Sequence, residues 1–186
     1  MKKNIDRRGF LKVTGLATLG LAGCANGLSW RNASGNDAQE GQEGEMTYRT
    51  NNVTGDKVSI LGYGCMRWPM TKGEDGKDVI DQEAVNRLID YAIEHGVNYF
   101  DASPVYLQGQ CEKATGIALA RHPRESYFIA TKLSNFSNSS RENSMLMYRK
   151  SLEYFQTDYI DYYLLHSIGG IGMEDFNKRY VDNGML

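Results

Sequence analysis

The most constraining feature of this chain is a strand–helix pattern that repeats along its length. Short runs of apolar and aromatic residues recur at intervals of roughly 30 residues, the length of a βαβ unit, with a helical pattern between each run and the next. These runs are 62–68, 97–103, 127–133 and 159–167. Strands joined by such long crossovers pair in parallel. The pattern therefore predicts an α/β fold in which helices cover a parallel sheet.

The segments between the runs have the features of amphipathic helices. In the first, Asp81 stands at a capping position and Gly96 just past the last turn. Its apolar residues form one continuous face: Val85, Leu88, Ile89, Ala92 and Ile93. A second helix is expected over about 111–121. A third is expected to open at Ser139, with Glu142 at the spacing of a capping box.

Other segments help to choose among the parallel folds. Residues 46–61 have the composition of a β-hairpin around a turn-forming Asn-Asn-Val-Thr-Gly-Asp, so a hairpin is expected to lead the fold. A polar loop is expected over 71–78 and a last helix from Glu174. Gly62 and Gly64 do not form a dinucleotide fingerprint, because the third glycine is missing and no helix opens there. A barrel is therefore favoured over a doubly wound nucleotide-binding sheet.

Three consecutive predicted strands end on a titratable residue, namely Asp101, Lys132 and His166. The carboxyl ends of strands in a βαβ sheet lie on one face, and in a strand–helix barrel that face holds the active site. Tyr106 follows Asp101 on the next loop, so all four side chains are expected to converge. One charged residue at a strand end is usually a solvated loop residue. Three in register argue against that interpretation.

These residue types together suit proton donation to a carbonyl oxygen. A free tyrosine is a weak acid with a pKa near 10, but an ammonium beside a phenol favours the phenolate. A carboxylate keeps such an ammonium charged and oriented, and a histidine can hydrogen-bond the carbonyl. The electrons must come from elsewhere, so a hydride cofactor is implied.

At this point the chain resembles the aldo-keto reductases. The matching stretches are 58–67, 96–106, 111–119, 129–133 and 159–167. The family's catalytic tetrad corresponds to Asp101, Tyr106, Lys132 and His166. By resemblance, Tyr106 is the general acid, Lys132 with Asp101 tunes it, and His166 positions the carbonyl of a small substrate.

The resemblance also implies a nicotinamide cofactor, NADPH or NADH. Its ring is expected near the end of the first barrel strand, beside Gly64, Cys65, Met66 and Arg67.

The chain departs from the family pattern around the tetrad. The family often has Thr-Ala after the aspartate, Gly after the tyrosine and Ser-Glu before the next helix. Here these positions are Ala102-Ser103, Leu107 and Cys111-Glu112. The tetrad is intact, so these changes place the substrate preference in doubt.

The number of strands sets a second expectation. A complete (β/α)8 TIM barrel has eight strand–helix units and about 250 residues, whereas residues 46–186 supply about four strands. They are expected to be the N-terminal part of such a barrel, lacking most of the cofactor site and inactive alone. The resemblance extends to a family branch with ferredoxin modules after the barrel. An iron-sulfur cluster is therefore expected only in a missing C-terminal part, together with an electron-transfer partner.

Other functions stay open at this stage. The chain could be a non-catalytic cofactor-sensing or scaffold barrel, or an inactive half-barrel, although a scaffold has no need of Tyr106 with Lys132. A hydrolase or metal enzyme using His166 and Asp101 as ligands is a weaker alternative. Only three histidines occur in the chain, and no metal site is predicted.

Residues 1–45 differ in composition from the rest. A basic head with Arg7 and Arg8 precedes an apolar segment too short to span a bilayer, which resembles a twin-arginine signal over 1–23. Leu-Ala-Gly-Cys resembles a lipobox, so Cys24 is expected to carry lipid and hold the protein at a membrane surface. Residues 24–45 are polar and read as a flexible tether. The expected product is exported and periplasmic, or a membrane-anchored lipoprotein.

The charge of the chain argues against one class of partner, and its cysteine content leaves a disulfide open. The formal net charge is −2, and no basic cluster follows the first dozen residues, which argues against nucleic acid. After Cys24, two cysteines remain, Cys65 and Cys111. They could pair, but sequence does not fix the geometry that a disulfide needs.

Overall fold

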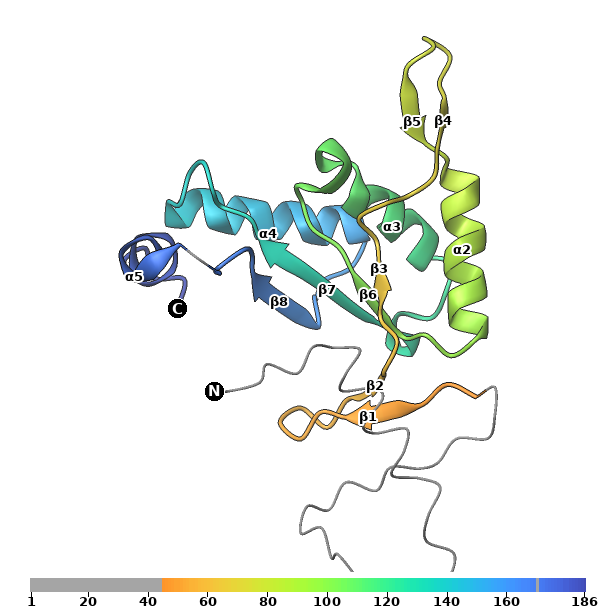
Figure 1. The fold of residues 1–186 in the computed structure, drawn as a ribbon, viewed down its shortest axis with the longest axis horizontal. Helices are drawn as coiled ribbons and strands as arrows, with labels where there is room; N and C mark the ends of the chain where they lie inside the picture. The colour runs from red at the N-terminus through yellow and green to blue at the C-terminus, as the bar shows by residue number, and fades with distance from the viewer. Residues whose placement is uncertain (1–44, 170) are drawn as a thin grey trace, which may run out of the picture. The chain divides into compact units, whose positions relative to one another are not determined.

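The computed structural model describes residues 45–169 and 171–186, coloured in Figure 1. The predicted signal segment 1–23, the lipidation site Cys24 and the tether as far as residue 44 lie outside these residues. Within the described residues, no helix combines the length and apolarity that a bilayer crossing requires.

A parallel sheet of four strands forms the centre of the fold. The strands are β3 (Tyr63–Gly64), β6 (Tyr99–Asp101), β7 (Phe128–Leu133) and β8 (Tyr162–Leu165), paired in that order. All three pairings are parallel, so the carboxyl ends share one edge. This confirms the predicted α/β architecture of a partial barrel.

Three helices cover one face of this sheet (Figure 1). They are α2 (Gln82–Glu94), α3 (Cys111–Leu119) and α4 (Arg141–Phe155), with single turns η1 (Tyr106–Gly109) and η2 (Arg124–Ser126) in the connections. Asp81 caps α2 as predicted, because its carboxylate accepts from the Ala84 N–H at 2.9 Å. The predicted cap of α4 was wrong by one residue: Ser140 accepts from the Asn143 N–H at 3.2 Å.

The core lies between these helices and the sheet. The predicted face of α2 contributes Val85, Ile89 and Ala92, which pack with residues of β6 and β7 such as Phe100 and Ile129. Helices α3 and α4 cross closely at Gly116, where a β-carbon would lie 2.0 Å from the Tyr154 carbonyl oxygen. Only glycine fits that crossing.

The leading hairpin is present as β1 (Tyr48–Thr50) and β2 (Lys57–Ser59). It is bonded to the segment before β6: the Tyr48 hydroxyl donates to Gly96 O at 2.8 Å, and the Asn98 side chain bonds both Ser59 N and Lys57 O. The hairpin therefore lies at the amino ends of the strands, away from the edge where the predicted site lies.

The predicted polar loop over 71–78 is instead part of a second hairpin, β4 (Met70–Lys72) and β5 (Asp78–Ile80). Gly76 takes a positive φ of 75° in its turn, and Lys72 pairs with Asp78 at 2.8 Å. Nearly all its residues are exposed, so no alternation of apolar and polar residues marked it as a strand pair.

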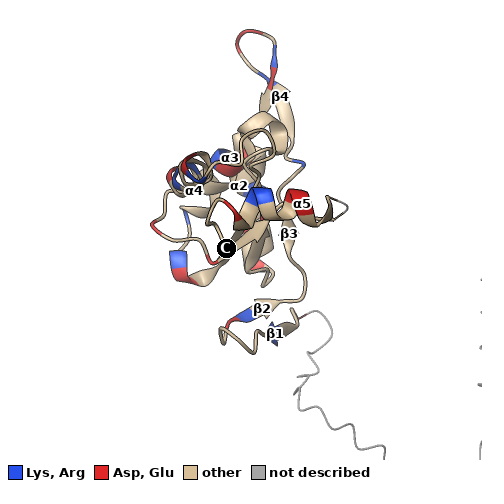
Figure 2. Cartoon of the chain, turned by 90° about the vertical axis from the view of Figure 1, so that its left-hand side faces the viewer, with Lys and Arg blue, Asp and Glu red and all other residues tan. Residues whose placement is uncertain are grey.

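The chain after β8 forms α5 (Gly172–Phe176) and a π-helical turn, η3 (Asn177–Val181). The predicted last helix thus begins two residues before Glu174. Tyr180 in η3 is fully buried, so this segment is attached to the rest of the fold. Figure 2 shows both signs of charge along the described elements, without a continuous stripe of either sign in that view.

Candidate active site

The site begins with an ion pair at the carboxyl edge of the sheet. Lys132 on β7 donates from Nζ to Asp101 Oδ1 on β6 at 2.5 Å and to the Ala102 carbonyl at 2.7 Å. The two side chains are 13% and 34% exposed. Both side chains leave the same face of the sheet at neighbouring strand ends, which fixes the ammonium at the edge.

Tyr106 lies beside this pair on η1, the turn that follows β6. The Lys132 ammonium is 4.9 Å from the centre of the Tyr106 ring. The two residues after Tyr106 are left-handed, with φ of 49° at Leu107 and 56° at Gln108. This turn returns the chain toward α3 and leaves the phenol at the edge of the sheet.

His166 follows β8 and completes the group. Its ring packs edge to face against Tyr106 at 5.7 Å between centres, and Phe136 lies at 5.2 Å. Burial lowers the pKa of His166, and the Lys132 and Arg179 charges lower it further, against the opposite effect of Asp101. The imidazole is therefore neutral at pH 7.

The structure thus brings Asp101, Tyr106, Lys132 and His166 together, as the strand ends predict. The sequence pattern of the aldo/keto reductase family matches residues 60–171, more than half of the chain. The chain belongs to the aldo/keto reductase family.

Similar proteins of known sequence are oxidoreductases. The chain is 33% identical over 120 residues to L-galactose dehydrogenase of Arabidopsis thaliana, a match covering 62% of this chain and 36% of the relative. It is 34% identical over 96 residues to D-arabinose 1-dehydrogenase of Saccharomyces cerevisiae, covering 47% and 28%. The chain spans about a third of the length of these curated relatives.

Solved aldo-keto reductases have the same arrangement of elements. The structure from Bacillus halodurans, in its holo form, gives a TM-score of 0.52 at 31% identity and covers 65% of this chain and 40% of that one. The reductase of Klebsiella pneumoniae in complex with NADPH gives 0.50 at 25% identity, covering 60% and 36%.

The aldo-keto reductase pattern often has glycine where this chain has Leu107. The backbone of Leu107 is left-handed, which explains why glycine suits that position. A residue with a β-carbon in this conformation costs about 1 kcal/mol of stability. Leu107 packs against the core instead, which offsets part of that cost.

The predicted cofactor residues separate into two groups. Gly64, Met66 and Arg67 are exposed at the end of β3, and a β-carbon at Gly64 would meet nothing within 4 Å. Cys65 is fully buried, so its side chain faces the core rather than this edge.

Cys65 and Cys111 are free thiols. The Cys111 thiol donates to the Cys65 carbonyl oxygen at 3.1 Å, and burial raises the pKa of Cys111 to about 11. Burial also raises the pKa of Cys65 well above its usual value. Both thiols are therefore protonated packing groups.

Two serines contact His166 that were not predicted as site residues. The Ser134 and Ser103 hydroxyls lie 2.6 and 3.3 Å from Nδ1 of the ring. A signal for them exists in the sequence: each stands two residues after a tetrad member, Lys132 or Asp101, and side chains two apart on a strand share a face. That rule applies less strictly beyond a strand's end, where both serines lie.

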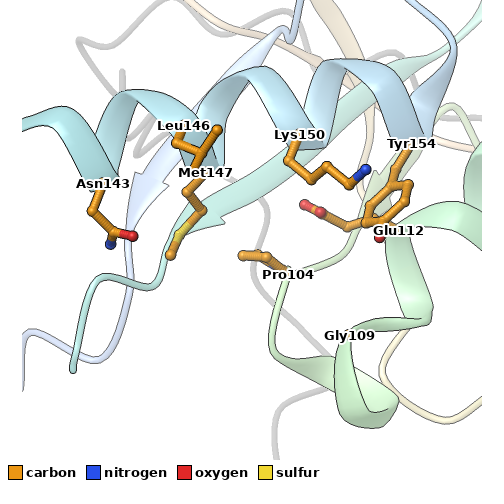
Figure 3. Close-up of a pocket in the computed structure, with 8 residues that line it drawn as sticks. All are labelled: Pro104, Gly109, Glu112, Asn143, Leu146, Met147, Lys150 and Tyr154. Atoms are coloured by element: carbon orange, nitrogen blue, oxygen red, sulfur yellow. The ribbon is translucent and has the colours of Figure 1, made fainter. Parts of the chain in front are cut away.

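A pocket of about 380 Å³ lies between the loop after β6 and helix α4 (Figure 3). Its lining includes Pro104, Met147, Tyr154 and Glu112, a residue that is 1% exposed. Glu112 accepts from Thr131 at 2.5 Å and from Ser151 at 2.9 and 3.1 Å, and burial raises its pKa. Its hydrogen bonds join α3 to β7 and α4, and none of them is to a tetrad residue.

In the part of the chain that the structure describes, no three His, Cys, Asp or Glu side chains gather closely enough to hold a metal ion.

Proposed function

We propose that this chain supplies the proton-donating side of an NAD(P)H-dependent carbonyl reductase, with Tyr106 as the general acid. The observation that supports this most directly is the position of Lys132, bonded to Asp101 and close to the Tyr106 ring. An ammonium beside a phenol stabilises the phenolate that proton donation leaves behind.

Each member of the tetrad then has a distinct task. Tyr106 gives its phenolic proton to the carbonyl oxygen, while Asp101 orients the Lys132 ammonium through their ion pair. Neutral His166 hydrogen-bonds the same oxygen and fixes its direction. A bound nicotinamide supplies the hydride to the carbonyl carbon, and the product is an alcohol.

The cofactor would be held in this chain at the end of β3. Gly64 stands opposite Asp101 in the strand register, and the space where its side chain would be is open. Met66 and Arg67 are exposed beside it. NADPH is favoured over NADH because a similar solved reductase is in complex with NADPH.

Two relatives are named for the oxidation of sugars, D-arabinose and L-galactose. A hydroxyl-rich substrate of this class is therefore the first to try, in the reverse direction with the oxidised cofactor. Because the chain spans about a third of these relatives, the assay uses the protein expressed from its full reading frame.

The test compares the parent with Tyr106→Phe. Turnover is followed by nicotinamide absorbance, with NADPH or NADH and para-nitrobenzaldehyde, and with the two sugars in reverse. We expect Tyr106→Phe to lose roughly a hundredfold to ten-thousandfold in kcat, while cofactor affinity, measured by protein fluorescence, stays within about twofold. Cofactor binding with no turnover in the parent would instead favour a cofactor-sensing barrel.

We also propose that the protein is exported by the twin-arginine route and anchored through lipid on Cys24. The support is the sequence order of basic head, apolar segment, lipobox and polar tether. Cys24→Ala is expected to move the mature protein from the membrane fraction to the soluble fraction, while Lys-Lys in place of Arg7-Arg8 keeps the precursor in the cytoplasm. A parent found only in the cytoplasm would refute export.

A further inference from the structure

A buried hydroxyl pair stands behind the ring of His166. Ser103 is fully buried and Ser134 is 4% exposed. Their hydroxyls lie 3.1 Å apart, and Ser134 is the nearer to His166 Nδ1, at 2.6 Å against 3.3 Å for Ser103. Because the pair is shielded from water, the surrounding protein groups determine which acceptor each hydroxyl proton bonds to.

Three hydrogen bonds hold the backbone of His166. Its N–H donates to Leu133 O at 3.2 Å, and its carbonyl accepts from the Tyr180 hydroxyl at 3.3 Å. Arg179 donates to the same carbonyl at 3.3 Å. With the ring neutral, its hydrogen bonding depends on which ring nitrogen carries the proton.

The direction of the hydrogen bonds is limited by the acceptors that the two hydroxyl protons can reach. The Val105 N–H, which can only donate, points to the Ser103 oxygen at 3.4 Å. The Ser103 proton can then go to Ser134, and the Ser134 proton to His166 Nδ1. In this order every hydroxyl proton has an acceptor, and Nδ1 accepts.

The opposite order is less favourable. If Nδ1 carried the proton and donated to Ser134, one hydroxyl proton of the pair would be poorly placed. The Ser134 hydroxyl could donate to Ser103, which leaves the Ser103 proton with no acceptor among the described residues, or to the Lys132 carbonyl oxygen at 3.5 Å. That distance exceeds the usual 2.5–3.0 Å or so of an O–H···O bond. The 2.6 Å contact to Nδ1 is well within hydrogen-bond range.

We propose that Ser103 and Ser134 are positioning residues that hold His166 as the tautomer protonated on Nε2. An Nε2–H can donate to a carbonyl oxygen, whereas a bare Nε2 would repel it. The use of this proton rests on the proposed function, but the tautomer itself does not. Ser103 stands where the family often has alanine, so this support is a property of this chain.

The direct test measures the nitrogen-15 NMR signals of the His166 ring rather than turnover. The protein from the full reading frame is labelled with nitrogen-15 histidine, and His166 is assigned by its loss in His166→Gln. We expect the parent to show a protonated Nε2 and an Nδ1 shifted as a hydrogen-bond acceptor. Ser134→Ala is expected to move Nδ1 toward its unbonded shift and change the tautomer ratio about fivefold, the worth of one hydrogen bond.

Matched variants distinguish the effects of the two serines from each other and from a general change in the fold. Ser103→Ala should give a smaller shift of Nδ1, because it removes the second hydroxyl of the relay. Ser137→Ala, at an exposed serine on the loop after β7, should leave the ring signals unchanged. Each variant removes one oxygen atom, and its amide spectrum checks that the fold is retained.

The outcomes distinguish this inference from the proposed function. A parent ring protonated on Nδ1, or ring signals that Ser134→Ala does not move, would overturn the serine assignment even if carbonyl reduction is observed. The expected ring signals in a protein that reduces no carbonyl would overturn the proposed function and leave the tautomer assignment standing. If both hold, Ser134→Ala lowers kcat roughly fivefold with KM little changed.

Discussion

Two carboxylates lie on opposite faces of strand β7, and they differ in exposure and in hydrogen-bond partners. Lys132 and Thr131 are neighbours on this strand, so their side chains leave opposite faces of the sheet. On one face Lys132 pairs with Asp101, a partly exposed carboxylate. On the other, Thr131 donates to Glu112, a carboxylate buried under the helices.

The hydrogen-bond partners of the two carboxylates differ in charge. This difference distinguishes a carboxylate placed for chemistry from one that stabilises the fold. Asp101 is bonded to a cation at the carboxyl edge of the sheet, and the Tyr106 ring lies close to that cation. Glu112 is bonded to the Thr131 and Ser151 hydroxyls, which satisfy it without supplying a charge that chemistry could use. We interpret the first face as the reacting one. On the second face, Glu112, Thr131 and Ser151 form a structural cluster, the clamp, that joins α3, β7 and α4.

The largest expected effect comes from removing the cation. Lys132→Met should lower kcat roughly a hundredfold to ten-thousandfold because the phenolate loses its stabilising charge. Stability should change far less, since Asp101 is 34% exposed and water can solvate it. Kinetics and urea unfolding of the same preparations measure both. A variant that keeps parental kcat would contradict the reacting role of this face.

The next effect tests the clamp. Gly116→Ala places a β-carbon 2.0 Å from the Tyr154 carbonyl oxygen, which is backbone and cannot turn aside. We expect α3 and α4 to move apart and the free energy of unfolding to fall by about 3 kcal/mol. Gly64→Ala is the matched control, because its β-carbon meets nothing within 4 Å. Equal losses in both variants would show that the close crossing is not the cause.

How far the sequence could predict these two faces depends on distance along the chain. Strand spacing predicted the parallel sheet, and strand ends predicted that four polar side chains lie together, because both follow from local pattern and the direction of the strands. The bond between Glu112 and Ser151 joins residues 39 apart, and no local pattern indicates it. The β4–β5 hairpin was missed because its exposed strands lack an apolar face.

A smaller effect comes from removing one hydroxyl of the clamp. Thr131→Val keeps the shape of the side chain but takes a donor from the buried Glu112 carboxylate. We expect a loss of about 2 kcal/mol in unfolding free energy, the cost of a buried group left short of a hydrogen bond. The values of kcat and KM should stay within about twofold of the parent. A large loss of kcat would mean that the two faces of β7 are coupled.

The smallest effect is the pH dependence of the clamp. Burial raises the pKa of Glu112 in the folded protein above its usual 4.5, so the folded state holds this proton more tightly than the unfolded state. Its contribution to stability is therefore full below pH 4.5 or so and declines as pH rises through the folded pKa. Glu112→Gln keeps a neutral side chain of the same shape, so its unfolding free energy should fall less than the parent's over that interval. Urea unfolding at several pH values measures the two slopes. Parallel curves would mean that the Thr131 and Ser151 hydroxyls fully offset the effect of burial on Glu112.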